Sequence, residues 1–392
     1  MSIKAQKNGD IVTISDLFTS INGEPHRITK VLAGVNNEVR TIYEKIIIKD
    51  KYYIYISNDR QSIIKTKDFE EFETLYTIST GYFTTIISIG KSVYAFSSPT
   101  TTGTNQNFTN HKVYKTANLI TWESHNFTSN ISLTIEDAYF GVVFHNGTFY
   151  TFAKQVVSSK AYVAVCKSTD GYSWTGYQLS AFTLTSPTLW HILSFGILTN
   201  EMTTILFCEL YAAASSKNYF KQYRIQDDNL SQATIVESGY DTAYYYNSDA
   251  NELMFTSDPA RYYTNFTIYS LDGSGNITSN NGRIMMAGPF IEYINGYLIK
   301  LRTGLTTTPN YVEMYNGTTL VQQFSAVNIY PYSSTIRSKN DNCLLIFKTD
   351  GTFYELDTIN ETLDFIGTIS NVVYLPFNSI GSWRNVGTIV EL

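Results

Sequence analysis

Two short tyrosine-rich segments carry the side chains best suited to binding a sugar. Residues 241–246 read Asp-Thr-Ala-Tyr-Tyr-Tyr, and residues 260–263 read Ala-Arg-Tyr-Tyr. Tyrosine offers a rigid aromatic plate at small entropic cost, and an arginine beside it donates directional hydrogen bonds. Because successive side chains of a strand point to opposite faces, at least half of these rings are expected to pack inside the protein. The predicted ligand-binding residues are Tyr244, Tyr245, Tyr246, Arg261, Tyr262 and Tyr263.

Acidic residues that could hydrolyse a glycosidic bond are present, but their surroundings are ordinary. Such hydrolysis normally needs two carboxyl groups roughly 5–9 Å apart across a cleft. The pairs Glu70-Glu71 and Asp227-Asp228, and Asp258, all lie in polar, turn-like stretches where solvation explains an acidic side chain. The five histidines show no metal-ligand spacing, and no nucleophile elbow or phosphate loop occurs. The sequence therefore predicts no catalytic residues, no metal site, no cofactor, and a protein that is not an enzyme.

Three segments, starting at Lys65, Lys115 and Lys167, align on one another without a gap, and their starts are 50 and 52 residues apart. They read Lys-Thr-Lys-Asp-Phe-Glu-Glu-Phe, Lys-Thr-Ala-Asn-Leu-Ile-Thr-Trp and Lys-Ser-Thr-Asp-Gly-Tyr-Ser-Trp. Asp and Asn suit tight turns because their side chains bond backbone N–H groups two residues on. We expect each segment to be a strand end, a turn, and an aromatic residue that returns into the core. The repeat residues are Asp68, Phe72, Asn118, Trp122, Ser168, Asp170, Gly171 and Trp174.

The third segment, Ser168 to Trp174, resembles the Asp-box of sialidase-like β-propellers, although it lacks one residue between Asp170 and Gly171. The resemblance implies a propeller fold. It also raises the question of sialidase activity, which in that family rests on clustered arginines, a Tyr/Glu nucleophile pair and an Asp acid. Such sialidases usually carry an Arg-Ile-Pro type motif before the first Asp-box. None of the nine arginines here precedes Ile-Pro or Leu-Pro, so sialidase activity is not expected.

Short apolar runs alternate with turns from about residue 45 onward. The turn centres fall near residues 50, 90, 146, 200, 249, 295 and 340, a spacing that fits one four-stranded blade each. Aromatic residues make up 15% of the chain and charged residues only 16%, which favours strands. We predict an all-β protein with a seven-bladed β-propeller, with six or eight blades as alternatives. The tail, residues 370–392, is expected to complete the first blade or to form half of an extra one, with strand-like runs at 372–375 and 386–392.

The first 44 residues differ from the rest. Residues 21–28 and 35–42 resemble each other, with Asn22 and Asn36 14 residues apart, and each reads as strand, turn and strand. Residues 30–40 resemble the short modules at the N-termini of tail and virion proteins of tailed bacteriophages, with Asn37 where glycine is commoner. The resemblance implies an attachment module. The predicted domains are therefore a virion attachment or oligomerisation module at residues 1–44 and a propeller at residues 45–392.

Charge and hydropathy indicate which classes of partner are not expected. The net charge is −6 and the basic residues are scattered, which argues against nucleic acid. No apolar run of 18 residues occurs and the N-terminal residues are polar, so neither membrane insertion nor a signal peptide is expected.

These observations predict a phage virion protein of the tail, baseplate or an appendage, assembled in the host cytoplasm and located in the virion. Residues 1–44 would contact other virion proteins, the chain would form a homo-oligomer on the particle, and the propeller would adhere to host cell-surface glycan. One alternative is a propeller glycosidase that acts on host surface polysaccharide. The other is a purely structural decoration protein.

Overall fold

The computed structural model contains two compact units, Met1–Asp50 and Lys51–Leu392. The predicted boundary at residues 44/45 lies a few residues earlier. In the first unit the structure describes residues 3–7, 10–14, 17–21, 24–28, 30–35 and 38–44. In the second unit it describes residues 51–100, 105–136, 140–157, 160–184, 190–199, 204–212, 217–226, 229–238, 242–247, 252–257, 263–272, 274, 277–285, 290–302, 311–324, 332–337, 342–376 and 387–391.

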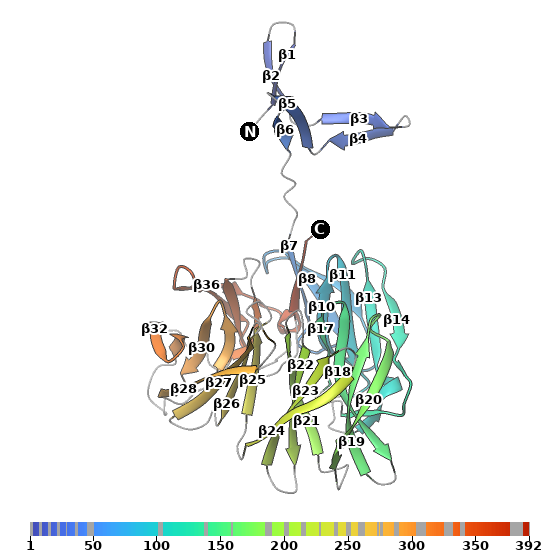
Figure 1. The fold of residues 1–392 in the computed structure, drawn as a ribbon. Helices are drawn as coiled ribbons and strands as arrows, with labels where there is room; N and C mark the ends of the chain where they lie inside the picture. The colour runs from blue at the N-terminus through green and yellow to red at the C-terminus, as the bar shows by residue number, and fades with distance from the viewer. Residues whose placement is uncertain are drawn as a thin grey trace. The chain divides into compact units, whose positions relative to one another are not determined.

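The first unit consists of three antiparallel hairpins (Figure 1), which pair β1 (Ile3–Lys7) with β2 (Asp10–Ile14), β3 (Leu17–Ile21) with β4 (Glu24–Ile28), and β5 (Lys30–Val35) with β6 (Glu38–Glu44). Exactly two residues separate the paired strands each time, and the first of the two is Asn8, Asn22 or Asn36. The sequence analysis found the second and third hairpins and missed the first. The signal was there, because Asn8-Gly9 is a strong two-residue hairpin dipeptide.

The described strands of the second unit form seven sheets, which we number in chain order. Sheet 1 contains β37 (Gly387–Glu391), β7 (Lys51–Ile56), β8 (Ser62–Thr66) and β9 (Phe72–Thr77). Sheet 2 contains β10 (Tyr82–Ile89), β11 (Ser92–Ser98), β13 (Lys112–Thr116) and β14 (Glu123–Asn126). Sheet 3 contains β12 (Asn105–Asn107), β16 (Thr134–Glu136), β18 (Thr148–Val157), β19 (Lys160–Ser168), β20 (Ser173–Leu184) and β15 (Thr128–Ser129), with β17 (Val143–His145) paired to β18.

The remaining four sheets have four strands each. Sheet 4 contains β21 (Trp190–Thr199), β22 (Thr204–Ala212), β23 (Lys217–Gln226) and β24 (Asn229–Ser238). Sheet 5 contains β25 (Thr242–Asn247), β26 (Glu252–Ser257), β27 (Tyr263–Leu271) and β28 (Ile277–Met285). Sheet 6 contains β29 (Phe290–Ile294), β30 (Tyr297–Arg302), β31 (Tyr311–Asn316) and β32 (Thr319–Phe324). Sheet 7 contains β33 (Tyr332–Arg337), β34 (Cys343–Lys348), β35 (Thr352–Asp357) and β36 (Thr362–Thr368).

The C-terminal strand closes the ring of sheets. Strand β37 pairs antiparallel with β7, from Gly387 opposite Tyr55 to Glu391 opposite Lys51. It also contacts β33 of sheet 7 and β10 of sheet 2, so it bridges the last sheet and the second one. The last strand of the chain thus completes the first sheet, and the all-β propeller arrangement has no open seam at this point.

One expected strand of the tail is a 3-10 turn instead. Residues Val372–Tyr374 form η4 rather than part of a strand. Asn371 explains the difference, because its side-chain oxygen accepts a hydrogen bond from the N–H of Val373 and its backbone oxygen accepts one from the N–H of Tyr374. A local Asx turn therefore competes successfully with strand pairing. A second 3-10 turn, η1 (Phe108–Asn110), precedes β13.

The hydrophobic core lies between neighbouring sheets. Between sheets 1 and 2, Ile54 and Ile63 belong to the same buried cluster as Val93. Between sheets 2 and 3, Phe96 and Trp174 share an aromatic cluster that also includes residues of the connection from β14 to β16. Sheets 6 and 7, and sheets 7 and 1, share buried apolar clusters in the same way. In the described part of the chain, no helix is long and apolar enough to cross a membrane.

Candidate functional site

The three repeat turns share one hydrogen-bonding geometry, and they join β8 to β9, β13 to β14 and β19 to β20. The Asp170 carboxylate accepts backbone N–H groups of Tyr172 and Ser173 at 2.9 and 2.7 Å. The Asn118 side-chain oxygen accepts those of Ile120 and Thr121, both at 2.9 Å. Asp68 accepts those of Glu70 and Glu71 at 3.0 and 3.4 Å. The backbone bond from Glu70, followed by that from Glu71, lowers the pKa of Asp68 against its slight burial.

The residue after the Asp or Asn has a left-handed backbone in all three turns. The φ angles are 64° at Phe69, 61° at Leu119 and 85° at Gly171. Left-handed φ costs a non-glycine residue roughly 1–2 kcal/mol. Phe69 and Leu119 bury their side chains between sheets, so packing offsets this cost. Gly171 instead has the rings of Tyr94, Phe96 and Phe149 around it.

The returning aromatic residues of the three repeats are not equally buried. Trp174 is only 3% exposed, whereas Phe72 and Trp122 are half-buried. Phe72 stacks on Tyr374, with ring centroids 4.9 Å apart, and Trp122 lies against Tyr76. The three repeats therefore share the hydrogen bonds of their turns but differ in the burial of their aromatic residues.

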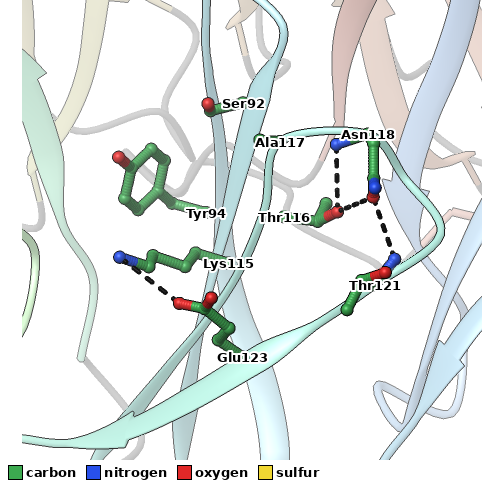
Figure 2. Close-up of a pocket in the computed structure, with 8 residues that line it drawn as sticks. All are labelled: Ser92, Tyr94, Lys115, Thr116, Ala117, Asn118, Thr121 and Glu123. Atoms are coloured by element: carbon green, nitrogen blue, oxygen red, sulfur yellow. Dashed lines mark hydrogen bonds and ion pairs between the residues drawn. The ribbon is translucent and has the colours of Figure 1, made fainter.

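A pocket of about 300 Å³ opens beside the second turn (Figure 2). Tyr94, Lys115 and Glu123 are direct cross-strand neighbours on β11, β13 and β14, so they share one face of sheet 2. Strand pairing thus brings together side chains that lie far apart in the sequence. The pocket is lined by Ser92, Tyr94, Lys115, Thr116, Ala117, Asn118, Thr121 and Glu123.

Tyr172 of the third turn, which belongs to sheet 3, contacts Lys115 and His125 of sheet 2. Its ring stacks on that of His125, with centroids 4.3 Å apart and an interplanar angle of 15°. The Lys115 ammonium lies 5.6 Å from the centroid of the Tyr172 ring. The Glu123 carboxylate lies 3.6 Å from Lys115 Nζ and 3.5 Å from His125 Nε2. Two aromatic rings, a cation, a carboxylate and an imidazole therefore meet where sheets 2 and 3 adjoin.

Sheet 1 provides an internal comparison for this group. It contains the equivalent ion pair, Lys65 with Glu73, again on its third and fourth strands. The cross-strand neighbour of Lys65 on the second strand is the fully buried Ile54, where sheet 2 has Tyr94. The lysine–glutamate pair is therefore a feature of the repeat, whereas Tyr94 and the pocket distinguish sheet 2 from sheet 1.

The predicted tyrosine site is distributed over one sheet. Tyr244, Tyr245 and Tyr246 lie on β25, opposite Phe255, Met254 and Leu253 of β26. Tyr263 begins β27, on the other side of β26, opposite Met285. Arg261 and Tyr262 lie outside the described residues. The structure thus places these tyrosines in sheet 5 but on strands that are not neighbours.

The acidic residues considered for catalysis do not form a described pair across a cleft. Glu70 and Glu71 are exposed at the first turn, where their backbone N–H groups bond Asp68. Asp227, Asp228 and Asp258 lie outside the described residues. Among the described side chains, no group of three His, Cys, Asp or Glu is arranged to hold a metal ion.

Sequence reasoning missed the pocket because strand register, and not motif spacing, assembles it. A lysine directly before the Thr or Ser of each repeat turn was visible at Lys65, Lys115 and Lys167. Its cross-strand partners could not be read without the register of the sheets.

No protein-family model and no curated protein matches the sequence. Solved structures do match. Two proteins assigned as 6-phosphogluconolactonases, from Bacteroides fragilis and Bacteroides uniformis, align with TM-scores of 0.51 and 12% identity over 88% of this chain and 100% of theirs. The GH93 alpha-L-arabinofuranosidase of Fusarium graminearum aligns with a TM-score of 0.40 and 11% identity over 80% of this chain and 96% of its own.

These similarities concern the fold, and the predicted all-β propeller class is confirmed. The prediction that the chain is not an enzyme is corrected, because proteins assigned as 6-phosphogluconolactonases share this fold. That prediction relied on missing sequence motifs. In this fold, strand pairing within a sheet and packing between neighbouring sheets bring together residues that lie far apart in the sequence, so a missing local motif does not exclude activity.

Proposed function

We propose that this chain is a glycan-acting β-propeller that binds carbohydrate in the pocket beside the second turn. The observation that carries the proposal is a pocket of about 300 Å³ whose lining includes Tyr94, Lys115 and Glu123. Tyr172 and His125 adjoin this lining through Lys115 and Glu123. Ligand pockets begin at about this size and combine aromatic walls with a few polar groups. In sheet 1 the place of Tyr94 is taken by a buried isoleucine, so the repeat does not require the tyrosine.

The pocket is suited to binding rather than to bond cleavage by its own residues. The two-carboxylate mechanism needs a second carboxyl group roughly 5–9 Å from the first. Glu123 is the one acidic residue in the pocket lining. We therefore assign the pocket to substrate holding within a protein whose proposed activity is glycoside hydrolysis.

A glycan array followed by calorimetry tests the binding, and release of reducing sugar from bacterial surface polysaccharides tests the hydrolysis. Tyr94→Ala is expected to weaken binding of the best array ligand by roughly ten-fold, which corresponds to the loss of one aromatic contact. Trp122→Phe, in the same sheet but outside the pocket lining, serves as a folded control. A wild-type protein that neither binds any glycan nor releases sugar would refute the proposal.

The attachment role of the first unit is a second proposal, with a separate observation in its favour. Residues 3–44 form three hairpins with the same two-residue spacing, in a unit distinct from the propeller. A lone two-stranded hairpin is at best marginally stable in water, so such a unit gains most from contact with other chains. Virion proteins and further copies of this chain are the proposed partners.

Deletion of residues 1–50 tests this role. The shortened protein should remain a folded propeller by circular dichroism but should sediment as a smaller species and fail to join particles. Unchanged sedimentation together with normal incorporation into particles would contradict the proposal.

A further inference from the structure

The ion pair in the pocket is looser than two other lysine–carboxylate pairs among the described residues. Lys65 Nζ lies 2.5 Å from a Glu73 carboxylate oxygen, and Lys348 Nζ lies 2.7 Å from Asp350. These are charge-assisted hydrogen bonds. Lys115 and Glu123 occupy the same register as the sheet 1 pair, yet their atoms are 3.6 Å apart, beyond hydrogen-bonding distance. Lys115 is thus held by charge and by the Tyr172 ring, without a hydrogen bond to its carboxylate.

A second nitrogen faces the same carboxylate. His125 Nε2 is shielded from solvent and has no hydrogen-bond partner, and Glu123 lies 3.5 Å from it. A buried polar atom without a partner is costly, so a group able to accept its hydrogen bond would be favoured here. Glu123 itself is 62% exposed and is free to turn toward water. Lys115 and His125 together favour a carboxylate between them. The Glu123 carboxylate forms a hydrogen bond with neither of them.

From this geometry we infer that the pocket takes a carboxylate-bearing sugar, such as a hexuronate unit of an acidic polysaccharide, whose carboxylate replaces Glu123 between Lys115 and His125. This inference rests on the proposed function and adds the class of glycan. Glu123 would act as a built-in competitor that keeps the cation paired until the ligand arrives.

The rest of the pocket favours a sugar over an acidic peptide. Tyr94 supplies an aromatic wall next to Lys115 on the neighbouring strand. Ser92, two residues before Tyr94 on β11, and Thr121 supply hydroxyl groups. The Asn118 side-chain oxygen is already used by the turn, which leaves its NH2 group to donate. Several donors and acceptors around one aromatic plate match a ring that carries many hydroxyl groups.

The test compares a galacturonate trisaccharide with its methyl ester by calorimetry on the full-length protein. The acid is expected to bind roughly ten-fold more tightly than the ester, the worth of a hydrogen bond to a charged group. Lys115→Met should abolish this preference. Glu123→Gln, an isosteric change at an exposed side chain, should tighten binding of the acid by about three-fold or more and change binding of the ester less, because the competitor loses its charge.

Sheet 1 supplies matched controls. Lys65→Met and Glu73→Gln change the equivalent pair outside the pocket, so neither should alter binding of the acid or the ester. Circular dichroism and thermal unfolding show which variants are folded. If Lys115→Met is not folded, Glu123→Gln alone decides the inference.

The possible failures are distinguishable. Equal binding of acid and ester, or weaker binding of the acid by Glu123→Gln, overturns the inference while the glycan proposal stands. A glutamate-rich peptide that binds as tightly as the uronate overturns the sugar assignment. Failure of every glycan to bind, together with no release of sugar, overturns both the inference and the proposed function.

Discussion

Substitution of Trp174 by alanine provides a sharp test of how the repeat stabilises the propeller. Trp174 is 3% exposed and belongs to the aromatic cluster between sheets 2 and 3. Its ring centroid lies 5.3 Å from that of Phe127 and 5.9 Å, edge-on, from that of Phe108. Phe108 belongs to η1 and Phe127 follows β14, so Trp174 packs two separate connections against β20. Truncation of a fully buried aromatic residue costs about 3–5 kcal/mol.

Trp122 is the matched control, because it occupies the same position of the second repeat but is only half-buried. Trp122→Ala should therefore cost less, about 1–2 kcal/mol, since the cost follows the area returned to water. Trp174→Phe is also informative. The Trp174 indole N–H has no hydrogen-bond partner among the described residues, so this change removes volume but no hydrogen bond and should cost about 1–2 kcal/mol.

Urea unfolding followed by tryptophan fluorescence and circular dichroism measures these differences, provided that the two probes coincide and the slope of the transition is unchanged. Equal losses for Trp174→Ala and Trp122→Ala would refute the reasoning, because burial would then not determine the cost. A loss below about 1 kcal/mol for Trp174→Ala would refute the packing itself.

Three further changes have defined outcomes. Hydrogen bonds from Lys348 and Thr352 lower the pKa of Asp350 to about 2. The carboxylate therefore contributes to stability above the unfolded pKa of ~3.9, and this contribution is lost as the pH falls toward 2. In Asp350→Asn, the free energy of unfolding should depend less on pH between these two values. Gly351→Ala should destabilise more than Gly147→Ala in chemical unfolding, because both have positive φ but only the Gly351 Cβ would collide with a backbone carbonyl; equal losses would contradict this account. Removal of residues 387–392 should abolish cooperative unfolding measured by calorimetry, and a variant that keeps one sharp transition would show that β37 is dispensable.

The architecture was more accessible from the sequence than the pocket, for physical reasons. The repeat turns depend on local chemistry, in which Asp68, Asn118 or Asp170 bonds N–H groups within three residues. Such local patterns can be found by aligning the sequence with itself. The pocket depends on the register of β11, β13 and β14 and on the approach of Tyr172 from another sheet. A short turn fixes the register of a hairpin, but a long connection separates the end of β11 at Ser98 from the start of β13 at Lys112, so their register could not be read from the sequence.

Two predictions about aromatic residues depended on features that cannot be read along the chain. The sequence suggested three equivalent buried aromatics, but burial depends on the neighbouring sheet, which differs between Phe72, Trp122 and Trp174. The tyrosine cluster was chosen for its density along the chain, and its members lie on the first and third strands of sheet 5. Its role in binding stays a prediction.

Closure of sheet 1 by β37 sets the order in which the protein can be made. Tyr55 donates a hydrogen bond to the backbone oxygen of Tyr374, 319 residues later in the chain, and Ser88 contacts Thr388 across a similar separation. Contacts of such range form slowly, because a long loop must close before they contribute. During synthesis, β7 would therefore wait with an unpaired edge until almost the whole chain has left the ribosome. A nascent chain stalled at that stage presents a bare strand that can pair with a neighbouring chain, so we expect translation speed and chaperone supply to govern the yield of this protein.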